Sequence, residues 1–302
     1  MKSLIAAALA TTALATGALA QNAAPITEFR IGILGGENAS DRMNNNECLR
    51  KYIEDALGVP TKIFAPADYN GVMQGLMGGT IDFAGLGASS YAGVYVQDPT
   101  AVTPVLTTAN PDGSYVYYSI GFARKDHNIT SMADMQGKVL GFGDPNSTSG
   151  YLIPSVELPS QGYSVTPGEY FKDVVFTGGH EQTIVAVNNG DIDGGVTWAD
   201  GQGNWEDGFN NGALRKAVDA GLIDMNDLVE IWRSKPIPNG PFVVRNALPD
   251  DVKAKVIAVM ENLKANDPDC AYGVAGGDNG GFVKIDPSYY DSIIAVRRAK
   301  SN

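Results

Sequence analysis

The chain has 302 residues, of which 44% are hydrophobic and 19% are charged, and its formal net charge is −12. This composition is typical of a well-packed globular protein and argues against a disordered chain or a coiled coil. The sequence has no basic stripe that could displace the counterions of a nucleic acid, so we do not expect DNA or RNA as a partner. A small anionic ligand is compatible with the charge, because anion sites are built locally from backbone N–H groups and hydroxyls.

The first twenty residues have the pattern of a secretion signal. Lys2 precedes a run of small and apolar residues that ends in Ala18-Leu19-Ala20, so we expect cleavage before Gln21. No segment of the chain approaches the roughly 18 continuous apolar residues of a membrane helix. We therefore expect a signal peptide at residues 1–20 and a periplasmic mature protein. No cysteine lies near the cleavage site, so no lipid anchor is expected.

The sequence contains two cysteines, Cys48 and Cys270. Because the periplasm oxidises thiols, we expect them to form one disulfide, and two separate buried thiols are the alternative. The histidines, His127 and His180, are far apart, and no paired Cys or His spacing occurs. The sequence therefore predicts neither a structural nor a catalytic metal site, and it indicates no cofactor.

The first part of the mature chain predicts strands that alternate with helices. Apolar runs that end in glycine or at turns predict strands, and apolar residues at helical spacing predict helices. The predicted order is a strand from Glu28, a helix over 44–57, a strand over 61–64, a helix over 68–77 and a strand over 81–86. This β-α-β-α-β order indicates an α/β lobe with a largely parallel sheet.

A second α/β series follows. The same patterns predict strands over 115–124, 138–142, 173–176, 194–198 and 229–232. They predict helices over 181–189 and 210–220, a short helix near Met225, an amphipathic helix over 249–264 and a final helix from Pro287.

The length of the mature chain, roughly 280 residues, is near the size at which single cores divide into two. The helices after residue 249 have no predicted partner in the second series, so we expect the chain to return to the first lobe. The predicted division is residues 28–119 and 238–302 for lobe 1 and residues 120–237 for lobe 2. Two crossings, near residues 119 and 238, would form a two-segment hinge.

The most informative segment is GFGDPNSTSGYLIP, residues 141–154. A strand ends in glycine, and Ser147, Thr148 and Ser149 lie where the next helix is expected to begin. Hydroxyls, unpaired first-turn N–H groups and the helix dipole together suit an oxyanion. An ordinary helix cap with a Ser-Thr turn is the alternative.

This segment resembles the signature of the phosphonate-binding proteins of ABC importers. Three further segments are similar to that family in the same order: FAPADY ahead of GVMQG from residue 64, GHE from residue 179, and IPNGP from residue 237. The resemblance implies the type II periplasmic-binding-protein fold, an α/β architecture of two lobes that each contain a mostly parallel sheet flanked by helices. It also implies a non-enzymatic binder that delivers a phosphonate to a membrane permease.

The resemblance also implies a set of anion-binding residues. Ser147, Thr148 and Ser149 would hold the phosphonate oxygens, and Tyr69 and Tyr117, from the other lobe, would complete the clamp. Strand register favours Tyr117 over the tyrosine that follows it. For either tyrosine, a core aromatic ring with its hydroxyl bonded internally is the alternative.

Two further residues match ligand-binding positions of the family. His180 would donate a hydrogen bond to the anion, and Asp200 would meet the ammonium of an aminoalkyl phosphonate such as 2-aminoethylphosphonate. The chain departs from the family pattern at Gly240, where a second acid is expected, and at Leu86, where an aromatic residue is expected. We expect Glu181 to point into solvent.

Two other functions remain open from the sequence. The ligand could be phosphite, phosphate or a sulfonate instead of a phosphonate. Alternatively, Ser147 or Ser149 could be the nucleophile of a periplasmic hydrolase with His180 as its base, although neither serine lies in a Gly-x-Ser-x-Gly pattern. We expect a monomer.

Overall fold

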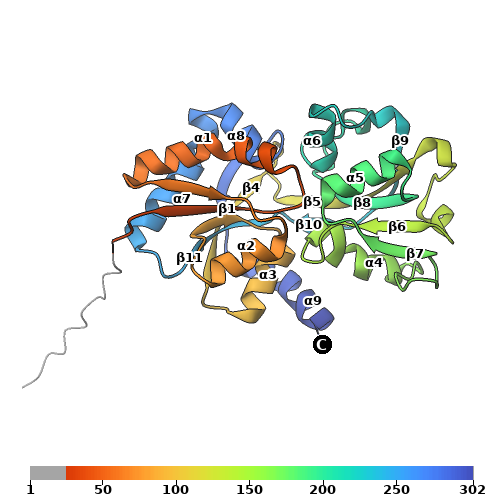
Figure 1. Ribbon diagram of the computed structural model, residues 1–302, viewed down its shortest axis with the longest axis horizontal. Helices are drawn as coiled ribbons and strands as arrows, with labels where there is room; N and C mark the ends of the chain where they lie inside the picture. The colour runs from red at the N-terminus through yellow and green to blue at the C-terminus, as the bar shows by residue number, and fades with distance from the viewer. Residues whose placement is uncertain (1–24, 302) are drawn as a thin grey trace, which may run out of the picture.

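A computed structural model describes residues 25–301, and the predicted signal peptide lies outside the described residues. Two six-stranded sheets, each flanked by helices, lie side by side (Figure 1). Within residues 25–301, no helix combines the length and the apolar character that crossing a bilayer requires.

The first lobe is built on the sheet with strand order β12-β4-β11-β3-β1-β2. Its strands are β1 (Phe29–Ile33), β2 (Thr61–Phe64), β3 (Phe83–Gly85), β4 (Val102–Ala109), β11 (Pro241–Arg245) and β12 (Gly281–Lys284). Its helices are α1 (Ala39–Leu57), α2 (Tyr69–Met77), α3 (Ala88–Gln97), α7 (Asp250–Asn266), α8 (Pro268–Ala275) and α9 (Asp291–Ser301), with a 3₁₀ turn at Pro287–Tyr290 before α9.

The second lobe is built on the sheet with order β10-β5-β8-β6-β7, in which β9 also pairs with β5. Its strands are β5 (Val116–Arg124), β6 (Val139–Phe142), β7 (Asp173–Phe176), β8 (Gly194–Ala199), β9 (Leu228–Arg233) and β10 (Ile237–Pro238). Its helices are α4 (Pro154–Ser160), α5 (His180–Asn189) and α6 (Ala213–Asp219), and a π-helical turn spans Thr148–Leu152. Short 3₁₀ turns occupy Lys125–His127, Met132–Met135, Trp205–Asp207 and Met225–Asp227.

Both sheets are mixed, whereas the sequence predicted mostly parallel ones. Strands β1, β2 and β3 pair in parallel, as do β6, β7 and β8, because helices connect them. Strand β11 pairs antiparallel with both β3 and β4, and β5 pairs antiparallel with β8, β9 and β10. Strand β11 enters its sheet directly from the other lobe, so no helical crossover sets its direction.

Helices cover both faces of the first sheet (Figure 1). Helices α1, α7 and α8 pack on one face through a cluster that includes Leu49, Val256 and Cys270. Helices α2, α3 and α9 pack on the other through a cluster that includes Val72 and Tyr290. Burying side chains of this size contributes about 1.5 to 3 kcal/mol each, so the two clusters fix the sheet edge from which the site residues project.

The chain passes between the lobes at two segments that contact each other. Strand β5 begins at Val116 and lies wholly in the second sheet, so the boundary predicted after residue 119 falls inside a strand. The backbone N–H of Asn239 donates to the carbonyl of Tyr115 (2.8 Å), which joins the two crossings. We propose that residues 110–115 and 239–240 form the hinge.

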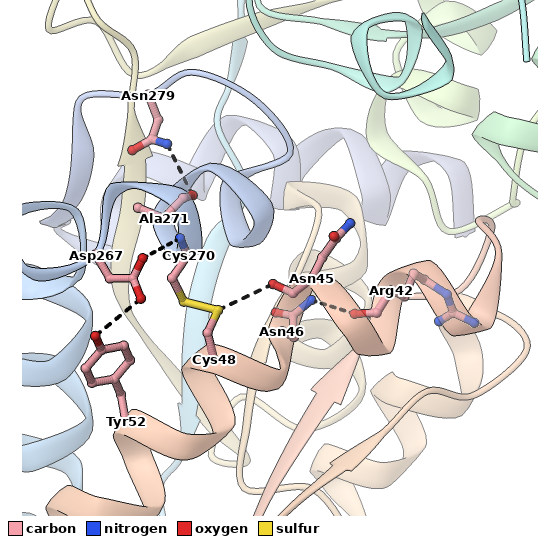
Figure 2. The surroundings of a disulfide bond; sticks show 9 residues. All are labelled: Arg42, Asn45, Asn46, Cys48, Tyr52, Asp267, Cys270, Ala271 and Asn279. Atoms are coloured by element: carbon pink, nitrogen blue, oxygen red, sulfur yellow. Dashed lines mark hydrogen bonds between the residues drawn. A yellow bond between two sulfur atoms is a disulfide. The ribbon is translucent and has the colours of Figure 1, made fainter. Parts of the chain in front are cut away.

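The expected disulfide is present between Cys48 on α1 and Cys270 on α8 (Figure 2). Asp267 caps α8 by accepting a hydrogen bond from the N–H of Cys270 (2.9 Å), and it also accepts one from the Tyr52 hydroxyl on α1 (3.3 Å). The covalent and polar contacts together hold α8, near the C-terminus, against α1, near the N-terminus.

Candidate functional site

A cavity of about 250 Å³ lies between the two lobes. Its walls come from β1, α1, α2 and α8 of the first lobe and from β5, β8 and the turn after β6 of the second. All seven residues that the sequence predicted for the site line this one cavity: Tyr69, Tyr117, Ser147, Thr148, Ser149, His180 and Asp200.

The hydroxyl-rich turn forms one end of the cavity. The Ser147 hydroxyl caps the turn by accepting a hydrogen bond from the N–H of Gly150 (3.0 Å). The Thr148 hydroxyl accepts one from the N–H of Ser89, in the first turn of α3 in the opposite lobe (2.8 Å). Because that N–H occupies a lone pair of the Thr148 oxygen, the hydroxyl proton is available to donate to an anion.

A π-helical turn, and not a regular α-helix, begins at Thr148. It runs directly into α4, whose first residue is Pro154. The wider turn exposes several backbone N–H groups near its start. The sequence alternative of an ordinary helix cap describes Ser147 correctly, yet the capped turn faces the cavity.

His180 is the first residue of α5 and is buried between two hydroxyls. Its Nε2 lies 3.2 Å from the Ser147 hydroxyl, and its Nδ1 lies 3.2 Å from the Thr197 hydroxyl. Burial lowers the pKa of His180 to about 4, so the imidazole is neutral at neutral pH. A neutral ring carries one N–H, which can reach an anion beside Ser147 without bringing a charge.

Tyr69 and Tyr117 present neutral phenols to the same turn. Burial raises the pKa of Tyr69, as do the carboxylates of Glu37 and Asp144, while hydrogen bonding with Ser147 opposes the shift. Burial also raises the pKa of Tyr117, opposed by hydrogen bonding with Ser149. Both hydroxyls therefore keep their protons and act as donors.

The two tyrosines come from different lobes. From the sequence, both were expected to come from the lobe opposite the hydroxyl-rich turn, and this expectation is wrong for Tyr117. Tyr69 begins α2 in the first lobe, but Tyr117 lies on β5, in the same lobe as the hydroxyl-rich turn, which follows β6. The reason is that the chain crosses between lobes before Val116. Tyr117 lines the cavity, whereas Tyr118 lies under the guanidinium of Arg233, which is 5.4 Å from the centre of its ring, so Tyr117 stays the predicted ligand-binding tyrosine.

Asp200 lies directly after β8 and is 3% exposed. Its Oδ1 accepts a hydrogen bond from the N–H of Gln202 (3.2 Å). Burial raises the pKa of Asp200 to about 6, although nearby backbone N–H groups oppose the shift. The side chain is thus a buried acid that a cationic group would hold in its ionised form.

The cavity also contains residues that the sequence reasoning missed. Trp198 packs edge-on against Tyr117, with ring centroids 6.1 Å apart. Lys216 lies 5.8 Å from the centre of the Trp198 ring and forms an ion pair with Glu37 of the opposite lobe (3.0 Å). Asn211 is buried beside Asp200. No local pattern marks these residues, because their contacts depend on how the lobes meet.

The two positions at which the sequence departs from the family pattern are both part of the cavity wall. Leu86 and Gly240 both line the cavity. A Cβ atom at Gly240 would lie 2.0 Å from the carbonyl oxygen of Leu86, so this backbone leaves no room for an acidic side chain there. The second acid expected at this point is therefore incompatible with the observed path of the chain.

Glu181 does not simply point into solvent as expected. Its carboxylate accepts a hydrogen bond from the N–H of Asn38 in the opposite lobe (3.0 Å), next to the Glu37–Lys216 ion pair. The N–H of Glu181 in turn donates to the carbonyl of Gly36 (3.3 Å). These contacts hold the two lobes together on one side of the cavity.

The contact between Ser147 and His180 does not form a catalytic triad. The second ring nitrogen of His180 faces the hydroxyl of Thr197, which cannot stabilise an imidazolium as a carboxylate would. Ser147 is also engaged as a helix cap. Within residues 25–301, no group of three or more His, Cys, Asp or Glu side chains is arranged to hold a metal ion.

Known proteins similar to this chain bind or import phosphorus oxyanions. Residues 31–290 match the family of periplasmic substrate-binding proteins of phosphonate ABC transporters. The phosphate-import protein PhnD of Mycolicibacterium smegmatis is 30% identical over 235 residues, which cover 75% of this chain and 68% of the relative. The phosphonates-binding periplasmic protein of Escherichia coli K12 is 28% identical over 214 residues, covering 70% of this chain and 58% of the relative.

Solved structures show the same fold. A binding protein of an ABC phosphonate transporter from Pseudomonas aeruginosa superposes with a TM-score of 0.77 at 24% identity, covering 91% of this chain and 86% of the other. PhnD1 of Prochlorococcus marinus, in complex with methylphosphonate, has a TM-score of 0.75 at 19% identity, covering 91% and 98%. The fold is the type II periplasmic-binding-protein fold, and the relatives are transport proteins, not enzymes. The chain belongs to the family of periplasmic phosphonate-binding proteins of ABC transporters.

Proposed function

We propose that this protein captures phosphonates between its lobes, including aminoalkyl phosphonates such as 2-aminoethylphosphonate, and delivers them to the membrane permease of an ABC importer. The observation that carries the proposal is the convergence of hydroxyl donors from both lobes at one end of a cavity between the lobes that has a buried acid in its wall. The proposed periplasmic route includes removal of the signal peptide at residues 1–20.

In this proposal the phosphonate oxygens lie against Ser147, Thr148 and Ser149, with Tyr69 and Tyr117 as further donors. All five are hydroxyl groups, and the pKa values of both tyrosines are raised, so the site offers donors without positive charge. Oriented hydroxyls and backbone N–H groups can replace the hydration of an oxyanion in a buried site. His180 adds a neutral N–H.

Asp200 gives the proposed preference for an amine. An ammonium group that replaces water around the buried carboxylate forms a charge-assisted hydrogen bond, and it returns the pKa of Asp200 towards its ordinary range. An alkylphosphonate without an amine would leave Oδ2 of this carboxylate without a donor. The protein should therefore bind 2-aminoethylphosphonate more tightly than an alkylphosphonate of similar size.

Closure of the lobes follows from the position of the donors. Tyr69 and the first turn of α3 belong to the first lobe, while the hydroxyl-rich turn belongs to the second. A ligand bound on the turn gains the contacts of the first lobe only when the lobes close, so its binding shifts the equilibrium towards the closed form. We propose that the permease recognises this form.

The site assignment is tested by replacing Thr148 with Ala and measuring phosphonate affinity by calorimetry. Loss of a hydroxyl that donates to a charged oxygen should cost about 1.5 to 3 kcal/mol, or roughly 10- to 150-fold in affinity. The matched control is Thr166→Ala, because Thr166 is exposed in the same lobe. Equal affinities for wild type and Thr148→Ala would show that the turn does not bind the phosphonate.

A second candidate ligand class is a smaller oxyanion, phosphate or phosphite. It is favoured by the relative from Mycolicibacterium smegmatis, which is named a phosphate-import protein. Such an ion would use the hydroxyl-rich turn but carries no ammonium group for Asp200. Melting temperatures in the presence of phosphate, phosphite, a sulfonate, methylphosphonate and 2-aminoethylphosphonate would rank the ligands, since tight binding stabilises the folded state.

A further inference from the structure

Two buried oxygen atoms in the cavity wall lack a hydrogen-bond donor. Among residues 25–301, Asp200 Oδ2 and Asn211 Oδ1 are buried and have no partner. Both residues line the cavity, and their side chains are 3% and 4% exposed. A buried acceptor without a donor costs free energy, so the pair indicates a place where a ligand supplies N–H groups.

The two residues are adjacent through the backbone. The N–H of Asp200 donates to the carbonyl of Asn211 (2.9 Å), and Ala199 and Gly212 form an antiparallel bridge beside them. Residues 199–200 and 211–212 are therefore neighbouring extended segments of the second lobe. Their side chains reach the same cavity from this short ladder.

The orientation of the Asn211 amide follows from its other contact. Its Nδ2 donates to the backbone carbonyl of Asp278 (3.0 Å). A carbonyl oxygen can only accept, so the NH₂ group must face Asp278 and the amide oxygen must be the other atom. Asn211 therefore presents an acceptor, and not a donor, on the side away from Asp278.

Asp278 belongs to the first lobe, in the segment between α8 and β12. Asn211 and Gly277 form an antiparallel bridge, and the N–H of Asp278 donates to the carbonyl of Asn210 (3.0 Å). The contact that fixes the amide is thus made between lobes. If the lobes separate, this contact is lost and the amide can rotate.

The cationic side chains that line the cavity already have partners. Lys216 pairs with Glu37, and Arg42 donates to the backbone carbonyls of Glu37, Ile33 and Leu34. These groups are therefore engaged elsewhere and do not supply the two acceptors. A cation that pairs with both Asp200 and Asn211 would therefore come from the ligand and not from these side chains.

We propose that Asn211 is a specificity-determining residue that, together with Asp200, binds the primary ammonium group of an aminoalkyl phosphonate. This inference rests on the proposed function. The amide oxygen of Asn211 offers an amine a second acceptor, whereas Gly240 leaves no room for the second acid of the family pattern. Because the amide is oriented only by the opposite lobe, recognition of the amine and closure of the lobes are coupled at this residue.

The test compares two ligands of nearly equal shape, 2-aminoethylphosphonate and n-propylphosphonate, in which a methyl group replaces the ammonium. Their dissociation constants are measured by calorimetry for wild type and for Asn211→Leu. Removing Asn211 also removes its bond to Asp278, so both ligands can lose affinity through closure. The ratio of the two dissociation constants isolates the amine, and we expect the preference for the aminoethyl ligand to fall by about 10-fold or more.

The same ratio is measured for Asn211→Ala, which introduces no bulky apolar group, and thermal melting of both variants verifies that they fold. An unchanged ratio in a folded variant would overturn the proposal, because Asn211 would then act on closure alone. A wild type that binds both ligands equally would also overturn it. If the wild type bound neither ligand, the proposed function itself would fail, which is a distinct result.

Discussion

At the scale of single residues, His180 and Asp200 are buried groups that both favour their neutral forms. Burial lowers the pKa of His180 to about 4 and raises that of Asp200 to about 6. The unfolded chain therefore binds more protons than the folded protein at His180 between about pH 4 and 6.5, so this group adds stability as pH rises. Asp200 does the opposite between about pH 4 and 6, and the two effects largely cancel.

Replacing Asp200 with Asn should remove one of the two opposing pH effects, so that the effect of His180 on stability can be measured alone. The variant keeps an oxygen for the N–H of Gln202 but no longer buries an ionised acid at neutral pH. We expect the ligand-free variant to be more stable than wild type at pH 7, by up to about 3 kcal/mol. Its stability should then decline as pH falls from 6.5 to 4, as His180 alone requires. Urea unfolding at pH 7 and pH 5 checks both; a variant less stable than wild type at pH 7 would contradict the assigned cause.

The ionised form of Asp200, which lowers the stability of the ligand-free protein, should favour the binding of an amine. An ammonium binds the ionised carboxylate, whose pKa is about 6 in the empty site, so affinity for 2-aminoethylphosphonate should weaken as pH falls below 6. n-Propylphosphonate controls for the titration of His180, and Asp200→Asn, measured with both ligands, controls for the different titration of the two phosphonates. Below pH 6 the affinity ratio of the two ligands should fall in wild type relative to its value in Asp200→Asn, by about 10-fold per pH unit. A ratio that varies equally in wild type and Asp200→Asn between pH 7 and 5 would remove Asp200 from amine binding.

The sequence predicted some of these residues and missed others for a physical reason. Ser147 and its neighbours lie in a local motif, a strand that ends in glycine before a hydroxyl-rich helix start. Such a motif can be recognised in the sequence alone. Asn211 lies in the irregular segment before α6, and Lys216 lies on α6. Only their contacts with the opposite lobe connect them to the cavity between the lobes. Such contacts leave no periodicity to read.

At the scale of helices and strands, the local sequence patterns predicted the centres of the helices better than their ends. Helix α1 begins at Ala39, five residues before its predicted start, because Asn38 caps it by accepting from the N–H groups of Ser40 and Asp41. Its first turns are polar and exposed, so apolar spacing did not reveal them. Helix α3 was missed because its small and hydroxyl residues are buried nearly all round and show no amphipathic pattern.

The backbones of the two lobes come close together at the N-terminus of α5. A Cβ atom on Gly179 would lie 2.1 Å from the Cα of Gly36 and 2.5 Å from its carbonyl oxygen. These are backbone atoms of the opposite lobe, so a side chain at Gly179 can be accommodated only if the lobes move apart. The backbone of Gly179 is extended, with φ at 178°, so the substitution introduces no backbone strain.

We therefore expect Gly179→Ala to favour the open form. Its affinity for every phosphonate should fall by about 10-fold or more, because ligand must then also close an unfavourable interface. Gly143→Ala is the control, since a Cβ there meets nothing nearer than 3.5 Å. Small-angle scattering should show a larger radius of gyration for Gly179→Ala with ligand than for wild type with ligand. Wild-type affinity in Gly179→Ala would mean that this contact does not limit closure.

At the scale of the whole molecule, the first lobe is assembled from two distant parts of the chain, with the second lobe inserted between them. The alternation of strands and helices predicted the two parallel cores, β1 to β3 and β6 to β8, because each connection is local. The antiparallel strands β11 and β12 were not predictable in the same way. Their positions depend on where the chain re-enters the first lobe, and β12 is only four residues long.

The disulfide encloses the whole second lobe in one covalent loop. Cys48 and Cys270 are 222 residues apart in sequence, and each belongs to one of the two segments that build the first lobe. A cross-link of this span restricts the unfolded chain strongly, and removing a native disulfide typically costs about 2 to 5 kcal/mol. Since α1 and α8 also form a wall of the cavity, through Asn45 and Gly273, the bond supports the first lobe where ligand binds.

We expect the double variant Cys48→Ala/Cys270→Ala to unfold at a lower urea concentration than wild type, with a loss of about 2 to 5 kcal/mol. Dithiothreitol should lower the midpoint of wild type towards that of the variant and leave the variant unchanged, which separates the bond from the substitutions. Saturating phosphonate should recover part of the loss, because a ligand that binds only the folded state stabilises it by mass action. If dithiothreitol left the wild-type midpoint unchanged while a thiol assay confirmed reduction, the cross-link would not contribute to the stability of the first lobe.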